Sequence, residues 1–159
     1  MPGITVVDCL GSDQTPDITD LKIAGANAAT YPEMSPGFRR AGICVVFSDP
    51  NISLVGPGYS KLPPNTFVTG SVDFSGQGRS RVMLRNRGLL HVYADKETGR
   101  FLGAEHVGPR AENIAHLLAW SLQQNLTIDE MLAMPFYHPV IEEGVRTALQ
   151  SAQAALKEG

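Results

Sequence analysis

The sequence is poor in cysteine and has no long apolar run. Its two cysteines, Cys9 and Cys44, are far apart and form no CxxC pair, zinc-ligand spacing or disulfide framework. No apolar run approaches the roughly 18 residues that a membrane-spanning helix needs. The first 17 residues have no basic flank followed by an apolar block, so we expect no signal peptide. The expectations are therefore a reducing, cytoplasmic setting and no membrane partner.

A large excess of one charge is also missing. Thirteen Lys and Arg residues against 16 Asp and Glu residues give a formal net charge of -3. This balance provides no electrostatic reason to expect a nucleic acid partner. Hydrophobic residues make up 43% of the 159 residues and charged residues 18%. These values are typical of a globular chain, long enough for one ordinary domain with a core.

Glycine-rich phosphate-binding motifs are absent as well. A GxGxxG fingerprint after an N-terminal strand would mark an FAD- or NAD-binding fold, and the sequence has none. The stretch SGQGRSR, residues 75–81, could grip an anion. It lacks the strand, loop and helix order of a phosphate loop, so a flexible turn is the simpler interpretation. We expect no cofactor to bind within this chain.

The chain does have a clear change of hydrophobic period. Residues 1–17 have no periodicity and are interpreted as a loose arm or the remnant of a preceding domain. Residues 18–29 place apolar side chains at helical spacing, with Asp17 as a possible cap, and a Pro- and Gly-rich linker follows. Short runs typical of strands come next, at residues 43–47, 52–56 and 66–74.

The clearest hairpin lies in the middle of the chain. LLHVYA (89–94) and FLGAEHV (101–107) flank the polar turn DKETGR, in which Gly99 can adopt a positive φ angle. Both faces of the first strand are fairly apolar, which predicts a central place in the sheet with both faces covered. The preceding residues, 81–88, are ambiguous between a helical turn and a strand.

Helical spacing dominates the C-terminal third. A helix is predicted over residues 111–124, and Thr127 is expected to cap a short helix. The last helix is predicted to begin at Pro139, because proline suits the first helical position. Its apolar stripe consists of Ile141, Val145, Ala148, Leu149, Ala152, Ala155 and Leu156. Strands followed by helices predict an α+β fold with a mostly antiparallel sheet and helices packed on it.

The stretch FYHPVIEEG, residues 136–144, combines residue types suited to acid–base chemistry. His138 would lie at the entrance of the last helix. A carboxylate one turn into the helix would hold one ring nitrogen and leave the other free to take a proton, as in a general base. Glu142 and Glu143 both compete for that place, and Glu143 would face away from the apolar stripe. Alternatively, both glutamates are solvated and simply favour the helix dipole.

Other candidate residues have simpler structural interpretations. His91 and His106 lie in the two hairpin strands and could approach each other, but two histidines without a third ligand are more often structural than metal-binding. His116 is off its helix's apolar stripe and is expected to be exposed. Cys44 is interpreted as an inert core thiol and Trp120 as a packing residue. We therefore expect no metal site.

Three motifs follow one another in an order that is specific as a set. VVFSDPNISLVG comes first, then DKETG with LG and GPRAE behind it, and then a His-Pro pair with a glutamate five positions after the histidine. This order resembles the C-terminal dimerisation domain of the FAD-dependent pyridine nucleotide–disulphide oxidoreductases, of the dihydrolipoamide dehydrogenase type. The resemblance covers about residues 42–150, and more loosely the helix at 18–30.

The resemblance implies an assembly and a role for two residues. In the family, this domain pairs with its twin across a two-fold axis, and the histidine of its His-Pro pair reaches the flavin and redox-active disulfide of the other subunit. Carried over, His138 is the acid/base of thiol chemistry and Glu143 orients it. The resemblance implies a homodimer here, and FAD and NAD(P) as cofactors of the parent family. Val140 departs from the family pattern, which has threonine after His-Pro.

Much of such an enzyme is missing from these residues. The sequence has no CxxxxC redox pair and no nucleotide-binding fingerprint. We expect residues 1–40 to be an arm and helix left from a preceding FAD domain, and 41–159 to be the dimerisation domain. Three functions stay open: a dimerisation domain that is silent alone, a subunit that supplies His138 and Glu143 in trans to a separate FAD- and NAD-binding polypeptide, or a repurposed binding module.

Overall fold

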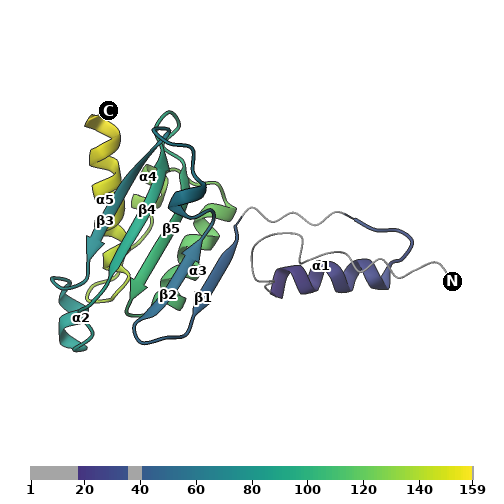
Figure 1. Cartoon of the computed structure of the whole chain (residues 1–159), viewed down its shortest axis with the longest axis horizontal. Helices are drawn as coiled ribbons and strands as arrows, with labels where there is room; N and C mark the ends of the chain where they lie inside the picture. The colour runs from purple at the N-terminus through teal and green to yellow at the C-terminus, as the bar shows by residue number, and fades with distance from the viewer. Residues whose placement is uncertain (1–17, 36–40, 159) are drawn as a thin grey trace. The chain divides into compact units, whose positions relative to one another are not determined.

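The computed structural model describes residues 18–35 and 41–158 of the chain (Figure 1). The chain divides into two units, residues 1–40 and 41–159. The first unit contains α1 (Ile18–Ala29), which confirms the predicted helix. The interpretation of residues 1–17 as a loose arm, and Asp17 as a cap, fall outside the described residues.

A five-stranded antiparallel sheet forms the base of the second unit. Its spatial order is β1-β2-β5-β4-β3, so the predicted hairpin of β4 and β5 lies inside the sheet. The strands are β1 (Ile43–Val46), β2 (Asn51–Val55), β3 (Phe67–Asp73), β4 (Leu89–Asp95) and β5 (Phe101–Gly108). A short 3-10 helix, η1 (Tyr59–Lys61), precedes β3.

Three helices cover one face of the sheet, which confirms the α+β prediction. They are α3 (Ala111–Gln123), α4 (Ile128–Leu132) and α5 (Glu143–Glu158). In Figure 1, α3 and α5 lie behind the sheet, and α3 packs on β1, β2 and β5 while α5 packs on β3 and β4. Thr127 caps α4 through a reciprocal pair of contacts with Glu130, as its place before the helix predicted.

No helix in residues 18–35 and 41–158 is long and apolar enough to cross a membrane.

The core lies between the sheet and the helices. The predicted stripe of α5 faces it, with Ala148, Leu149 and Ala152 fully buried. Gly70 in β3 allows this close packing, because a Cβ atom there would overlap the backbone of Ala148 in α5. The small side chains of α5 and the glycine opposite them therefore bring the helix tightly onto β3.

The last helix begins at Glu143, so the prediction that it starts at Pro139 is wrong. The N–H groups of Gly144 and Val145 donate to carbonyls only three residues back, each at 2.9 Å, which is a turn pattern rather than an α-helix. Val140 has its N–H and its carbonyl bound by two side chains. The segment before Glu143 is therefore hydrogen-bonded without helical geometry.

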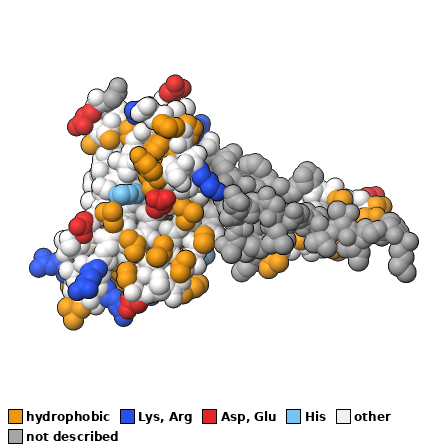
Figure 2. Space-filling view, in the orientation of Figure 1, with side chains coloured by type: hydrophobic (Ala, Val, Ile, Leu, Met, Phe, Trp, Pro, Cys, Tyr) orange, Lys and Arg blue, Asp and Glu red, His pale blue; other side chains and the backbone are white. Residues whose placement is uncertain are grey.

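The prediction that both faces of the hairpin are covered holds only in part for the second face. Tyr93 is fully buried there, against the rings of Tyr59 and Phe67. In the described part of this unit, no α-helix covers that face. Strand register aligns one apolar residue from each of four strands across it. These residues are Val46, Ile52, Val107 and Leu89, and all four are partly exposed. Figure 2 shows hydrophobic side chains gathered on the same face.

Between β3 and β4 lies α2 (Gly78–Val82), a short helix that projects from one end of the sheet (Figure 1). Its N-cap is Gln77, whose side chain accepts a hydrogen bond from the N–H of Ser80. The interpretation of residues 75–81 as a flexible turn is therefore wrong. The stretch is an ordered turn that leads into a capped helix.

Candidate functional site

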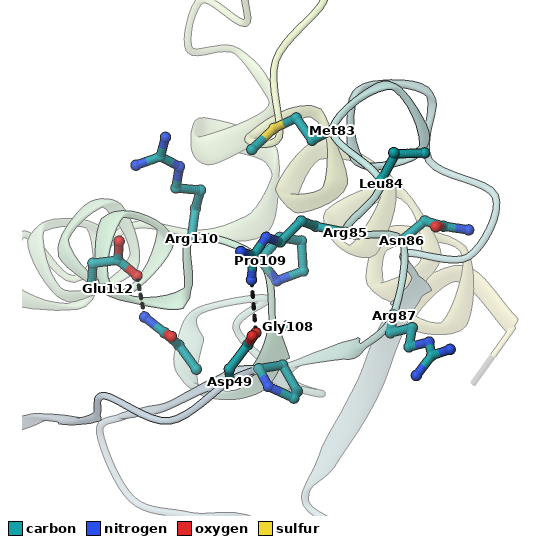
Figure 3. A pocket seen from close by; sticks show the side chains of 12 residues that line it. Asp49, Met83, Leu84, Arg85, Asn86, Arg87, Gly108, Pro109, Arg110 and Glu112 are labelled. Carbon is teal, nitrogen blue, oxygen red and sulfur yellow. Dashed lines mark hydrogen bonds and ion pairs between the residues drawn. The ribbon is translucent and has the colours of Figure 1, made fainter.

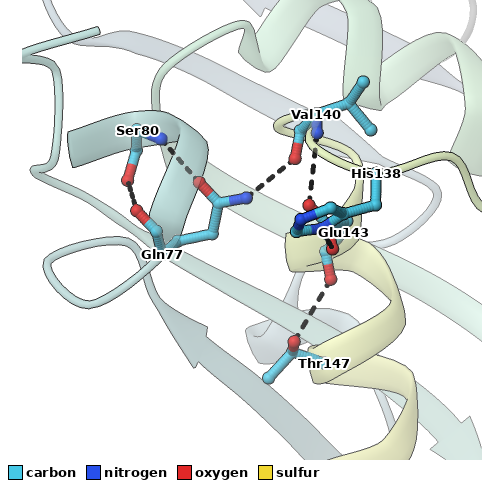
Figure 4. Close-up of polar contacts among 6 residues, drawn as sticks. All are labelled: Gln77, Ser80, His138, Val140, Glu143 and Thr147. Carbon is cyan, nitrogen blue, oxygen red and sulfur yellow. Dashed lines mark hydrogen bonds and ion pairs between the residues drawn. The ribbon is translucent and has the colours of Figure 1, made fainter. Parts of the chain in front are cut away.

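His138 and Glu143 lie together where α5 begins. Nδ1 of His138 is 2.7 Å from Oε1 of Glu143, and the histidine side chain is 79% exposed. The other carboxylate oxygen, Oε2, accepts the N–H of Val140 at 3.2 Å (Figure 4). Of the two competing carboxylates, Glu143 is thus the one that contacts the histidine, and Glu142 lines a neighbouring groove instead. The interpretation of Glu143 as merely solvated is wrong.

This arrangement gives the two ring nitrogens of His138 different roles. When Nδ1 donates to the carboxylate, the neutral ring has a lone pair on Nε2. A ring held in this way can take a proton from an acidic group presented from outside and later return it. The pair therefore has the geometry of an oriented general base on an exposed surface.

The surroundings of Glu143 favour its charged form. The hydrogen bond from His138 is the main cause that holds the carboxyl pKa below its ordinary range. The N–H of Val140 and the nearby charge of Arg146 lower this pKa further, while partial burial opposes them. Glu143 is therefore a carboxylate at neutral pH.

An apolar groove of about 570 Å³ lies beside the segment that carries His138, between α3, α4, residues 134–140 and the start of α5. Four of its large apolar side chains are exposed: Leu117, Trp120, Met134 and Tyr137. Trp120 is 67% exposed, so its interpretation as a packing residue is wrong. It projects from α3 on the side away from the buried stripe that contains Leu118. The spacing of Leu117 and Trp120 at i, i+3 was the signal that could have shown this second apolar stripe.

The hairpin histidines do not come together. His106 pairs with Leu90 and His91 pairs with Glu105, so the two rings point to opposite faces of the sheet. His106 is buried and stacks on Phe74 with ring centroids 5.1 Å apart. The prediction that the two histidines could approach each other is wrong, because strand register separates them.

The remaining candidate residues, His116 and Cys44, do not form part of a metal site among the described residues. His116 is exposed, as predicted. Cys44 is a free thiol, half-buried on the open face of the sheet rather than in the core. Within residues 18–35 and 41–158, no group of three or more His, Cys, Asp or Glu side chains is arranged to hold a metal ion.

A second cleft, of about 930 Å³, lies between the end of α2 and the start of α3 (Figure 3). Arg85 is paired with Asp49 at 2.8 Å across it. Arg87 and Arg110 also line it, but their side chains point away from each other in Figure 3. These arginines therefore do not converge on a point where a phosphate group could be held.

The family described as the dimerisation domain of pyridine nucleotide-disulphide oxidoreductases matches residues 43–149. The chain belongs to this family. Dihydrolipoyl dehydrogenase of Haloferax volcanii is 32% identical over 109 residues, which are 67% of this chain and 23% of that protein. Dihydrolipoyl dehydrogenase 3 of Haloarcula marismortui is 30% identical over 133 residues, 82% of this chain and 26% of that protein. The chain thus spans about a quarter of the length of these relatives.

Solved structures share the fold of this dimerisation domain. The flavoprotein disulfide reductase RclA of Escherichia coli, as a Cu(II) complex, matches with a TM-score of 0.76 and 21% identity, over 90% of this chain and 33% of that one. LpdA of Mycobacterium tuberculosis matches with a TM-score of 0.69 and 20% identity, over 80% of this chain and 28% of that one. At such identities, the likeness establishes the fold alone.

The contact between His138 and Glu143 can be tested through the pKa of the carboxyl group. In His138→Ala, we expect the Glu143 pKa to rise toward its ordinary value, because the main cause of its lowering is removed. Carbon-detected NMR titration of the glutamates measures this change. The pKa of Glu130, which is lowered by Thr127 in the cap of α4, is the internal control and should not move. An unchanged Glu143 pKa would show that the pair does not form in solution.

The free energy of unfolding of the dimerisation domain should depend on pH through His106. Burial lowers its pKa from 6.5 to about 4, with Glu112 opposing the shift, so the unfolded chain binds a proton here before the folded chain does. We expect the free energy of unfolding to fall by roughly 3 kcal/mol as the pH drops through that window. In His106→Met, urea denaturation across the same pH range should lose this slope. Equal slopes in both proteins would contradict the assignment.

Proposed function

We propose that this dimerisation domain of a dihydrolipoamide dehydrogenase-like flavoprotein reductase forms a two-fold dimer and presents His138 as the acid/base of a thiol redox centre. The observation that carries the proposal is the contact of 2.7 Å between Nδ1 of His138 and Glu143, with the rest of the ring exposed. An exposed histidine that merely capped a helix would need no carboxylate on its ring.

Each residue of the pair has its own task. Glu143 fixes the tautomer and orientation of the ring, so that Nε2 faces outward. Nε2 then accepts the proton of a substrate thiol and leaves a thiolate, which is the nucleophile of thiol–disulfide exchange. The imidazolium returns the proton to the thiolate that leaves later in the exchange. Glu143 is a positioning residue in this scheme and His138 is the catalytic one.

The flavin, the pyridine nucleotide and the redox disulfide of this scheme are held outside the 159 residues. The support is in the sequence, which has no GxGxxG fingerprint and no CxxxxC pair. The isolated chain is therefore expected to be catalytically silent. Polypeptide of the same longer protein, or a separate FAD- and NAD-binding subunit that docks in trans, would supply the redox centre.

The groove beside His138 is the proposed face of self-association. It brings together four exposed apolar side chains, from α3 and from residues 134–140, and such patches mark interaction sites. The occupant is a second copy of the chain, because the family is defined by dimerisation and two-fold contacts are self-complementary. Tyr137 and Val140, on either side of the His-Pro pair, line this groove, which suits a ring that must reach across to the partner.

Trp120→Asp tests this face of self-association. We expect the parent chain to be a dimer without flavin absorbance, and the variant to have a dissociation constant raised about thirtyfold or more, as for loss of a tryptophan hot spot worth ~2 kcal/mol. Sedimentation velocity over a concentration series measures both. Val82→Asp places the same charge on an exposed residue of α2 that does not line the groove, and should leave the dimer intact. A monomeric parent chain at every concentration would overturn the proposal.

Docking of a separate flavoprotein subunit in trans can be tested by a pull-down. A pull-down with the tagged chain from its source cells would recover a yellow flavoprotein if a separate subunit supplies the redox centre. Recovery of the chain alone, as a colourless dimer, would favour a redox centre within the same longer protein.

A further inference from the structure

The segment that carries His138 is held from α2 as well as from α5. Gln77 donates from Nε2 to the carbonyl of Val140 at 2.8 Å, while its Oε1 accepts the N–H of Ser80 at 2.6 Å. Both ends of the amide group are therefore used, which fixes its orientation. Figure 4 shows Gln77 reaching from the start of α2 to Val140.

Val140 connects this contact to the acid–base pair. Its carbonyl accepts from Gln77, and its N–H donates to Oε2 of Glu143 at 3.2 Å. The other oxygen of Glu143 contacts Nδ1 of His138 at 2.7 Å. A continuous series of hydrogen bonds thus runs from the cap of α2, through the backbone of Val140, to the imidazole ring.

The residues at the start of this series of hydrogen bonds, next to the cap of α2, are firmly packed. Ser80 is fully buried, and its hydroxyl lies 2.7 Å from the carbonyls of both Phe74 and Gln77. Phe74 is also fully buried and touches the first turn of α5, where a Cβ atom at Gly144 would come within 2.7 Å of its ring. The start of α2 and the start of α5 are therefore packed together independently of the hydrogen bond from Gln77.

We propose that Gln77 is a positioning residue for His138, and the proposal rests on the acid–base role given to that histidine above. Gln77 holds the carbonyl of Val140, which keeps the Val140 N–H directed at Glu143. The carboxylate in turn stays in the place where it can hold the ring. Gln77 touches neither the ring nor any reacting group, so its effect passes entirely through Val140 and Glu143.

The two tasks of Gln77 can be separated by substitution. Serine is a strong N-cap, so Gln77→Ser retains an acceptor for the N–H of Ser80 but cannot reach Val140. Gln77→Met keeps the length of the side chain and loses both the cap and the contact with Val140. Gln150→Ser makes the same change as Gln77→Ser at an exposed position of α5 and is the matched control.

Three NMR signals of the full chain report on the effect. In Gln77→Ser and Gln77→Met alike, we expect the Glu143 pKa to rise and the imidazole nitrogen shifts of His138 to move toward those of free histidine. Hydrogen exchange of the Val140 amide should accelerate about fivefold, as for the loss of one ordinary hydrogen bond. Gln150→Ser should leave all three signals unchanged.

Two results would overturn the role of Gln77. One is a Gln77→Ser variant that behaves as the parent chain while only Gln77→Met differs, since Gln77 would then matter only as the cap of α2. The other is a Glu143 and His138 pair that is unchanged in both variants. None of these signals depends on catalysis. A failure of the proposed function and a failure of the positioning role are therefore distinguishable.

Discussion

The two oxygens of the Glu143 carboxylate bind different groups. Oε2 closes the turn before α5 by accepting the Val140 N–H, and Oε1 holds the imidazole of His138. Because Glu143 is also the first residue of a long helix, the positive end of the helix dipole favours its charge. One charged group thus joins the backbone of the loop, the ring and the helix, and the proposed chemistry has no oriented base without it.

Packing on the core side of α5 determines where this carboxylate lies. Gly70 lets α5 approach β3 closely, and Gly144 lets the first turn of α5 pack against the ring of Phe74. A side chain at either glycine would push the helix away from the sheet. The position of an exposed acid–base pair therefore depends on two glycines in the tightly packed layer behind it, one of them the residue next to Glu143.

Local patterns predicted the elements well, and long-range geometry accounts for the errors. The hairpin, α3, the cap at Thr127 and the stripe of α5 follow from periods that neighbouring residues fix among themselves. The residues themselves did not decide between Glu142 and Glu143, which lie four and five positions after His138; only the resemblance pointed to Glu143. Which face of the sheet His91 and His106 point to depends on strand register. The contact of Gln77 with Val140 joins residues 63 positions apart in the sequence.

In the proposed function, Glu143 holds His138 through Nδ1 and leaves Nε2 open for proton exchange with a thiol centre outside the chain. Nitrogen NMR of the imidazole, recorded at a pH where the ring is neutral, reports which nitrogen bears the hydrogen. We expect the hydrogen on Nδ1 of His138 in the parent chain and a loss of that preference in Glu143→Gln. A hydrogen on Nε2 of the parent chain, unaffected by the substitution, would contradict it.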